Sequence, residues 1–277
     1  MSKQIGDDEI RLIGQPGSHG WRPRWWLYVS LAAVVVGIAI WALASHARGG
    51  MATRADAAAE HTPDWLADAD TTQPGIYHTS LTVDTTVLDI YYPVMATAEL
   101  CLGAPDTADK GILMATLAAD LRRDNGRIVG AFVLHGEPLS WGLSKRGYCA
   151  IIDGVVTVGV ADNSPLFEQA TETGGDFFRQ YPAVDGGCAV RNNPENSAFR
   201  RALCSIDGRI CIVASAGRMT MDAFACALVQ AGVQDAVFLV GGSADGWYRE
   251  YDGSVHRLGS TYVRNNRFVN YIVFRQQ

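Results

Sequence analysis

The sequence lacks a cluster of basic residues outside its N-terminal region. Lys and Arg number 23 against 29 Asp and Glu, so the 277-residue chain carries a formal net charge of -6 at pH 7. Nucleic-acid binding needs a basic face that releases counterions from the phosphate backbone. We therefore expect no nucleic-acid partner.

The cysteines also lack the spacing of metal ligands. The six cysteines are Cys101, Cys149, Cys188, Cys204, Cys211 and Cys226, and they form neither a CxxC pair nor a Cys/His pattern. A structural zinc site needs such clustered ligands, so the sequence indicates no metal and no cofactor.

If Asp207-Gly208 is a two-residue hairpin turn, Cys204 and Cys211 face each other, either as a disulfide bridge or as two packed thiols.

One stretch contains no charged residue at all: Trp25 to Ala44 reads WWLYVSLAAVVVGIAIWALA. About twenty apolar residues span the roughly 30 Å hydrocarbon layer of a membrane. Trp26 and Trp41 also stand where interfacial aromatic residues anchor such helices. We therefore expect a transmembrane helix over residues 25–45, with the lipid bilayer as its partner.

The charges beside this stretch predict its orientation. Lys3, Arg11, Arg22 and Arg24 precede it, and Arg48 follows it. The more positive flank of a membrane helix stays in the cytosol. We expect a cytosolic tail over residues 1–24 and a C-terminal domain outside the cytosol, in the periplasm if the chain is bacterial. A cleaved signal peptide is the alternative, with a weak cleavage site at residues 42–44.

Composition changes after the apolar stretch. Residues 46–75 are rich in Ala, Thr and Asp and contain Pro63 and Pro74, which is typical of a linker. Apolar patterning begins at residue 76. A chain of this size with 48% hydrophobic residues can bury a large core, so we expect one domain over residues 76–277.

The patterning of this domain predicts strands, hairpins and helices. Strands are expected at residues 81–93, 98–103, 127–134, 209–215 and 236–240, with hairpin turns at Asp153-Gly154, Asp207-Gly208 and Asp252-Gly253. Helices are expected from Asp106 or Thr107 to about Arg123, from Ser164-Pro165 to Gly174, and from Thr220 to Gly232. Two of the helices connect strands as β-α-β crossovers. The expected fold class is therefore mixed α/β (α+β), with crossovers and several hairpins in one mixed sheet.

A glycine loop follows the last crossover strand, which ends at Val240. Loops at the carboxyl ends of such strands are where α/β folds place ligands. Glycine leaves backbone N–H groups accessible to an anion, so Gly241, Gly242 and Ser243 are candidate substrate-binding residues. Asp245, just beyond them, is a candidate for proton transfer. A tight turn without a ligand is the alternative.

Two arginines enter the strand before the Asp207-Gly208 turn. Strand alternation places Arg200 and Arg201 on opposite faces, so one of them can point into a site. Its planar guanidinium would suit a phosphate or a carboxylate. The alternative is that both are solvated or paired with surface acids.

Further candidates lie beside glycine residues. His135 and Glu137 follow the strand at 127–134 at its expected carboxyl end, where an imidazole and a carboxylate could share acid and base catalysis. A loop histidine without chemistry is the alternative. Trp247, next to the glycine loop, could stack on a sugar face, with core packing as the alternative.

Three strings in the chain carry a resemblance to a known family. They are IVGAFVLHGEPLSWG, GGDFFRQYP and AFRRALCSIDGRICIVASAGRMTMDAFACALVQAGVQDAVFLVGGSADGWY. In this order they resemble the phosphodiester glycosidase family, over about Ala98 to Tyr248. Residues that match the family's arginine strand and glycine run are Arg201, Gly241, Gly242 and Ser243. Val240 stands where the family has an aspartate, and His135 occupies the place of its asparagine.

The resemblance implies a hydrolase that releases a sugar from a glycan phosphodiester. With the anchor expected over residues 25–45, this hydrolase would be membrane-anchored and exported. Arg201 would hold the phosphate, and the glycine loop would donate backbone N–H groups. His135, Glu137 or Asp245 would transfer protons. The alternatives are a non-catalytic domain that binds an envelope glycan or sugar phosphate, and a tethered interaction domain without a small-molecule site.

Overall fold

The computed structural model describes residues 64–192, 195–241, 244–259 and 266–277. The expected cytosolic tail and transmembrane helix lie outside these residues, as do Gly242 and Ser243. Across the described ranges, no helix has both the length and the apolar character to cross a membrane. Residues Ala55–Gln277 belong to one compact unit, and only this unit is described below.

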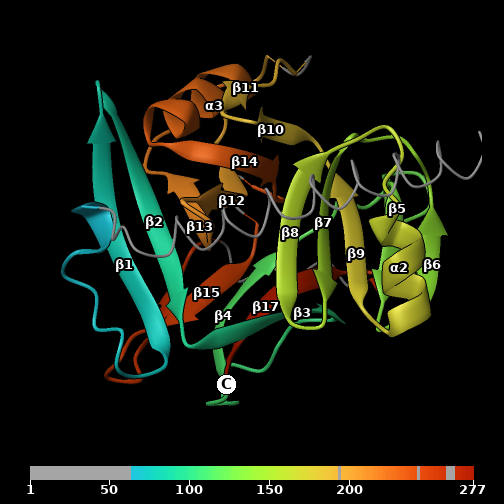
Figure 1. Cartoon of the computed structure of the whole chain (residues 1–277), viewed down its shortest axis with the longest axis horizontal. Coiled ribbons are helices and arrows are strands. Elements are labelled where there is room, and N and C mark those ends of the chain that lie inside the picture. Colours follow the sequence, from blue (N-terminus) through green and yellow to red (C-terminus); the bar gives the residue numbers. More distant parts are fainter. Residues whose placement is uncertain (1–63, 193–194, 242–243, 260–265) are drawn as a thin grey trace, which may run out of the picture. The chain divides into compact units, whose positions relative to one another are not determined.

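Three sheets form the framework of the described domain (Figure 1). The first contains, in spatial order, β1 (Gly75–Val83), β2 (Thr86–Val94), β13 (Arg209–Ser215), β12 (Arg201–Ile206), β14 (Val233–Phe238), β10 (Pro182–Asp185) and β11 (Cys188–Ala189). The second contains β16 (Val255–Arg257), β15 (Gly246–Arg249), β4 (Ile112–Leu117), β17 (Asn270–Gln276) and β3 (Ala96–Leu102). The third contains β6 (Glu137–Trp141), β5 (Ala131–Leu134), β9 (Asp176–Gln180), β7 (Gly147–Ile152) and β8 (Val155–Val160). The helical elements are a 3-10 turn η1 (Asp64–Leu66) and the helices α2 (Leu166–Thr173) and α3 (Met221–Gln230).

All three expected hairpins are confirmed. Asp153-Gly154 joins β7 to β8, Asp207-Gly208 joins β12 to β13, and Asp252-Gly253 joins β15 to β16. Asp207 and Gly208 both have positive φ angles, 48° and 73°. Two consecutive positive φ angles define the turn that matches the twist of paired strands. Asp153-Gly154 has the same pattern, whereas at Asp252-Gly253 only the glycine has a positive φ angle.

Helix α3 and its crossover are also confirmed. The Thr220 side chain accepts a hydrogen bond from the Ala223 N–H at 3.1 Å, and Gly232 follows the helix with φ 85°. The helix connects β13 to β14, and both of these strands pair antiparallel with β12. β13 and β14 therefore run parallel to each other with β12 between them. Helix α2 likewise ends at Gly174 with φ 77°, as expected.

The helix expected from residue 107 to residue 123 is wrong, because this segment contains strand β4. The strand lies between β15 and β17, and its first five residues are at most 4% exposed. Leu, Met and Ala favour helices, and a short apolar run buried on both sides shows no alternation that would reveal a strand. Burial inside the second sheet outweighs that local preference.

The expected fold class is only partly right. Every strand pairing among the described residues is antiparallel, and the expected first β-α-β unit does not exist. The described domain is mostly β, with two α-helices. Part of the expected linker also packs on it, since Leu66 is 4% exposed and the Tyr251 hydroxyl donates to the Asp70 carbonyl at 2.9 Å.

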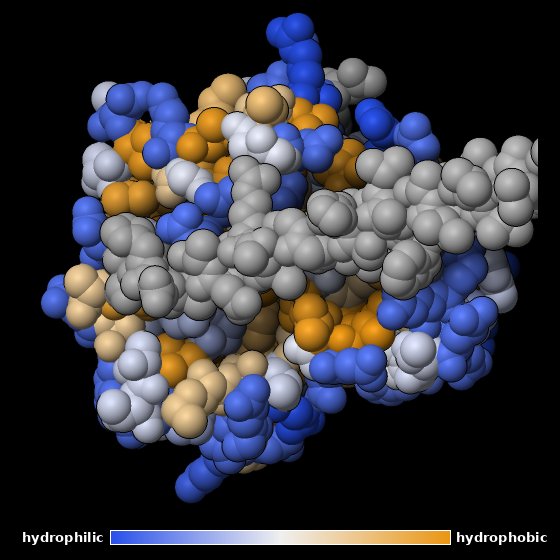
Figure 2. Space-filling view, in the orientation of Figure 1, coloured by the Kyte–Doolittle hydropathy of each residue, from blue (hydrophilic) through white to orange (hydrophobic). Residues whose placement is uncertain are grey.

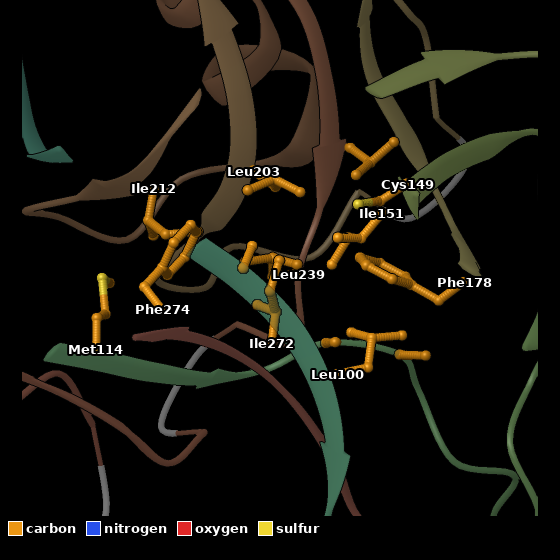
Figure 3. Packing of buried hydrophobic residues seen from close by; sticks show 14 of the residues in the cluster. Leu100, Met114, Cys149, Ile151, Phe178, Leu203, Ile212, Leu239, Ile272 and Phe274 are labelled. Atoms are coloured by element: carbon orange, nitrogen blue, oxygen red, sulfur yellow. The ribbon is translucent and has the colours of Figure 1, made fainter. Parts of the chain in front are cut away.

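A shared core holds the three sheets together. Figure 3 shows side chains from all of them meeting: Leu203 and Ile212 from the first sheet, Leu100, Met114, Ile272 and Phe274 from the second, and Cys149, Ile151 and Phe178 from the third. A second cluster lies between α3 and the first sheet. On the face that Figure 2 shows, hydrophilic residues cover most of the rim, and hydrophobic residues are exposed in separate patches.

Cys204 and Cys211 face each other in the hairpin register, and both remain free thiols. Each is 0% exposed. Burial in the cluster under α3 raises the pKa of the Cys211 thiol to about 12. The pair therefore has a packing role, which was one of the two alternatives.

Candidate functional site

A cavity of about 510 Å³ lies where β2, β12 and β13 meet the segments after β14 and β16. We call it the arginine pocket, and the residues that define it are Asp89, Tyr91, Arg200, Arg201, Gly241 and Arg257. Three of these side chains are cationic and one is anionic. A cavity with this excess of positive charge suits an anionic ligand.

Arg201, at the start of β12, is the buried arginine of the pocket. Arg201 is 3% exposed. Its Nη1 donates to Thr116 Oγ1 at 2.6 Å, and its Nη2 donates to the Leu258 carbonyl at 2.8 Å. Burial lowers the pKa of its guanidinium to about 10, while Tyr91 and Asp245 oppose that shift. The side chain therefore remains charged at neutral pH. Of the two arginines, Arg201 is the buried one, and its role in ligand binding stays a prediction.

Arg200 and Arg257 also line the pocket. Arg200 Nε donates to the Met219 carbonyl at 3.0 Å. Arg257 Nη1 lies 3.2 Å from Asp245 Oδ1, and the Tyr271 hydroxyl donates to Asp245 Oδ2 at 2.9 Å. Asp245 is 3% exposed, so the structure places this candidate behind the pocket, where it holds Arg257.

Strand β2 supplies residues that the sequence analysis missed. Asp89 and Tyr91 are two residues apart, so they share the strand face that borders the pocket. Asp89 Oδ1 accepts a hydrogen bond from Ser80 Oγ at 2.7 Å and lies 3.6 Å from His78 Nε2. The His78 ring stacks on Tyr91 with centroids 4.6 Å apart. A carboxylate between the core residues Leu88 and Ile90 was the available signal.

Gly241 brings the glycine loop against the arginine strand. A Cβ atom at this position would lie 3.0 Å from the Phe199 carbonyl oxygen and 3.4 Å from the Arg201 nitrogen. Glycine is thus needed for the close approach of the two backbones. The candidates Gly242 and Ser243 lie outside the described residues.

His135 and Glu137 are not part of the pocket. His135 and Gly136 form the turn between β5 and β6, with φ angles of 48° and 81°. His135 Nδ1 lies 3.3 Å from Asp176 Oδ1, which also accepts from the His135 N–H at 2.7 Å. None of the described hydrogen bonds and ion pairs of His135 reaches the arginine pocket. His135 does follow the carboxyl end of β5 as expected, but the chain turns there into the β5–β6 hairpin of the third sheet.

Trp247 packs in the core. It is 1% exposed in a cluster with Ala115, Val269 and Tyr271. Its ring also has the Arg249 guanidinium 5.7 Å from its centroid. This placement corresponds to the alternative of core packing and leaves no open face for a sugar.

A smaller cavity of about 220 Å³ lies at the end of β4 and beside Val240, the residue before Gly241. We call it the Asp120 pocket, lined by Leu117, Ala119, Asp120, Leu121, Val240, Val269 and Asn270. Val240 lines this cavity and the next residue, Gly241, lines the arginine pocket. Leu117, the last residue of β4, thus lies near the start of the glycine loop. A helix was expected from the sequence at this position. Among the residues that the structure describes, no group of three His, Cys, Asp or Glu is placed to bind a metal.

Comparison with known proteins gives a fold relationship. No protein-family model and no curated protein matches the chain. The catalytic domain of zebrafish N-acetylglucosamine-1-phosphodiester alpha-N-acetylglucosaminidase, auto-inhibited by its pro-peptide, matches with a TM-score of 0.52 and 12% identity, over 78% of this chain and 87% of that chain. A hypothetical protein from Synechocystis matches with a TM-score of 0.52 and 14% identity, over 72% of this chain and 62% of that chain. The chain therefore has a fold related to that of a phosphodiester glycosidase domain.

Proposed function

We propose that this domain is a hydrolase that binds a sugar phosphodiester, with the phosphate in the arginine pocket, and releases the sugar. The observation that carries the proposal is the group of three arginines, Arg200, Arg201 and Arg257, around one cavity. The related fold of a phosphodiester glucosaminidase domain supports the same substrate class.

The pocket suits a phosphodiester for electrostatic reasons. Guanidinium groups form strong, charge-assisted hydrogen bonds with phosphate oxygens. Arg257 is fixed by Asp245, and Arg201 by Thr116 and Leu258. Donors that are fixed before the ligand arrives lose little on reorganisation and stabilise charge that develops on the leaving phosphate.

Asp89 is the carboxylate placed to transfer a proton in this reaction. It lines the cavity, with His78 and Ser80 beside it. Hydrolysis breaks the bond between the sugar carbon and the phosphate oxygen. The hydroxyl group of water adds to the sugar carbon, and the remaining proton of that water goes to the released phosphate oxygen. Asp89 would guide the water or the proton, in the role first assigned to His135 and Glu137.

Replacing Asp89 with Asn is expected to lower turnover by roughly a hundredfold or more, as for the loss of a general acid or base. Affinity for dimethyl phosphate should stay the same or rise slightly, because a negative charge leaves the pocket. Sugar release and dimethyl phosphate titration with the full-length chain measure the two effects. Asp84→Asn, at the exposed β1–β2 turn, is the matched control; an active Asp89→Asn chain would exclude this role.

A non-catalytic glycan-binding domain is the second candidate. Two observations favour it: Val240 stands where the resembling family has an aspartate, and His135 and Glu137 lie away from the pocket. Saturable phosphodiester binding that needs Arg201, together with no sugar release from any substrate tested, would establish this function in place of hydrolysis.

Membrane anchoring through residues 25–45 is part of the proposal, with the domain outside the cytosol. The uncharged run from Trp25 to Ala44 supports it. The full-length chain is expected to stay in the membrane pellet after extraction at alkaline pH, and a chain that starts at residue 55 should be released. Recovery of the full-length chain in the soluble fraction would contradict the anchor.

A further inference from the structure

We propose that the Asp120 pocket binds the sugar ring of the phosphodiester, with Asp120 accepting hydrogen bonds from ring hydroxyls. This inference rests on the proposed function, because it takes the phosphate to lie in the arginine pocket. It assigns a binding role to Asp120, which follows β4.

The walls of the Asp120 pocket match the two sides of a sugar ring. Leu117, Leu121 and Val240 provide apolar surface, and Asp120 is the one ionisable side chain among the described lining residues. Small-molecule sites are typically apolar with a few fixed polar groups that orient the ligand. A pyranose offers both an apolar C–H face and an edge of hydroxyl donors.

A buried lysine fixes the Asp120 carboxylate. Lys145, 5% exposed, donates from Nζ to Asp120 Oδ2 and to Gln180 Oε1. Its Nζ lies 4.5 Å from the centroid of the Tyr181 ring. No hydrogen bond from a described residue reaches Asp120 Oδ1, and the Asp120 side chain is 39% exposed. One oxygen is thus held by the protein while the other is open to a hydroxyl group.

The two pockets have no lining residue in common, but neighbouring residues of the chain connect them. Val240 and Gly241 are consecutive, and each lines one pocket. Thr116 accepts the hydrogen bond from Arg201, and the next residue, Leu117, lines the Asp120 pocket. In a sugar phosphodiester the sugar and the phosphate are joined directly, so such a ligand needs two binding regions that are connected in this way.

Saturation-transfer NMR with the full-length chain tests this inference. The probes are dimethyl phosphate, for the arginine pocket, and a panel of neutral methyl glycosides, for the Asp120 pocket. Asp120→Asn is expected to weaken glycoside binding by roughly tenfold, since the amide offers a single, uncharged acceptor oxygen. Dimethyl phosphate affinity should change less than twofold, which also shows that the variant is folded.

Two further variants separate a ligand role from a structural one. Asp124→Asn, on the same loop but exposed and paired with Arg122, should bind both probes as the unchanged chain does. Val240→Phe should fill the pocket without touching Lys145, so glycoside binding should be lost and dimethyl phosphate binding kept. If Val240→Phe still binds glycosides, the sugar does not occupy this pocket.

The outcomes distinguish this inference from the proposed function. If dimethyl phosphate binds but no glycoside does, or if Asp120→Asn binds glycosides normally, the sugar subsite is refuted and the phosphate site stands. If dimethyl phosphate does not bind the unchanged chain, the proposed function itself fails.

Discussion

Replacing Arg201 with Met is expected to weaken phosphodiester binding by roughly a hundredfold or more, because a buried charge partner of the ligand disappears. Met retains much of the length of the side chain but has no donor. Thr116 and the Leu258 carbonyl also lose their hydrogen bonds, so the pocket wall loses its fixed geometry. Calorimetric titration of the full-length chain with a sugar phosphodiester measures the effect.

A matched variant controls for the loss of one positive charge. Arg218 is exposed and donates to the Ser197 carbonyl at 2.7 Å. Arg218→Met should leave phosphodiester affinity within about twofold, because exposed charges contribute weakly. Equal losses in the two variants would mean that general electrostatic attraction, and not the pocket, binds the ligand.

Replacing Arg179 with Met is expected to destabilise the domain by about 3 to 5 kcal/mol, because one buried and two partly buried carbonyl groups lose a charged donor. Arg179 is 1% exposed on β9. Nη1 donates to the carbonyls of Lys145 and Ala161 at 2.7 and 3.0 Å, and Nη2 donates to that of Asp162 at 3.0 Å. These bonds tie together the segments that flank β7 and β8.

Arg179 and Arg201 form a test pair, since both are buried but only Arg201 lines the arginine pocket. Urea denaturation should show the loss of stability in Arg179→Met, and the folded variant should bind a phosphodiester normally. If Arg179→Met loses affinity as Arg201→Met does, binding depends on the intact fold and not on the pocket arginine.

Local chemistry made the hairpins and two helices predictable from the sequence. Asp207-Gly208 adopts the backbone angles that its turn requires, and Thr220 caps α3 with its own side chain. Each of these features depends on residues a few positions apart. The pairings between hairpins, such as β13 with β2 and β17 with β3, join distant segments, and the sequence contains no comparable local signal for them.

Strand β4 shows what local pattern cannot supply. Its residues favour a helix in isolation, and its neighbours β15 and β17 follow more than a hundred residues later in the chain. The wrong helix prediction also led to wrong candidate site residues. With a helix assigned there, Asp120 and the end of β4 were not considered, and His135 was assigned the same kind of position as the glycine loop, at the carboxyl end of a crossover strand.

The candidate site was predictable where one strand or loop carried it. Alternation along β12 identified Arg201, and the open backbone N–H groups of a glycine loop identified Gly241. Asp89 and Tyr91 were missed because β2 joins β13 only through long-range pairing. Asp245 was identified as functional from its sequence position, and the structure gives it the task of holding Arg257.

The proposed function is tested most directly by incubating the full-length chain with a panel of sugar phosphodiesters and measuring the released sugar. We expect sugar release from at least one member of the panel, saturable in substrate and lost in Arg201→Met but kept in Arg218→Met. No release and no saturable binding across the panel would contradict a phosphodiester site in the arginine pocket.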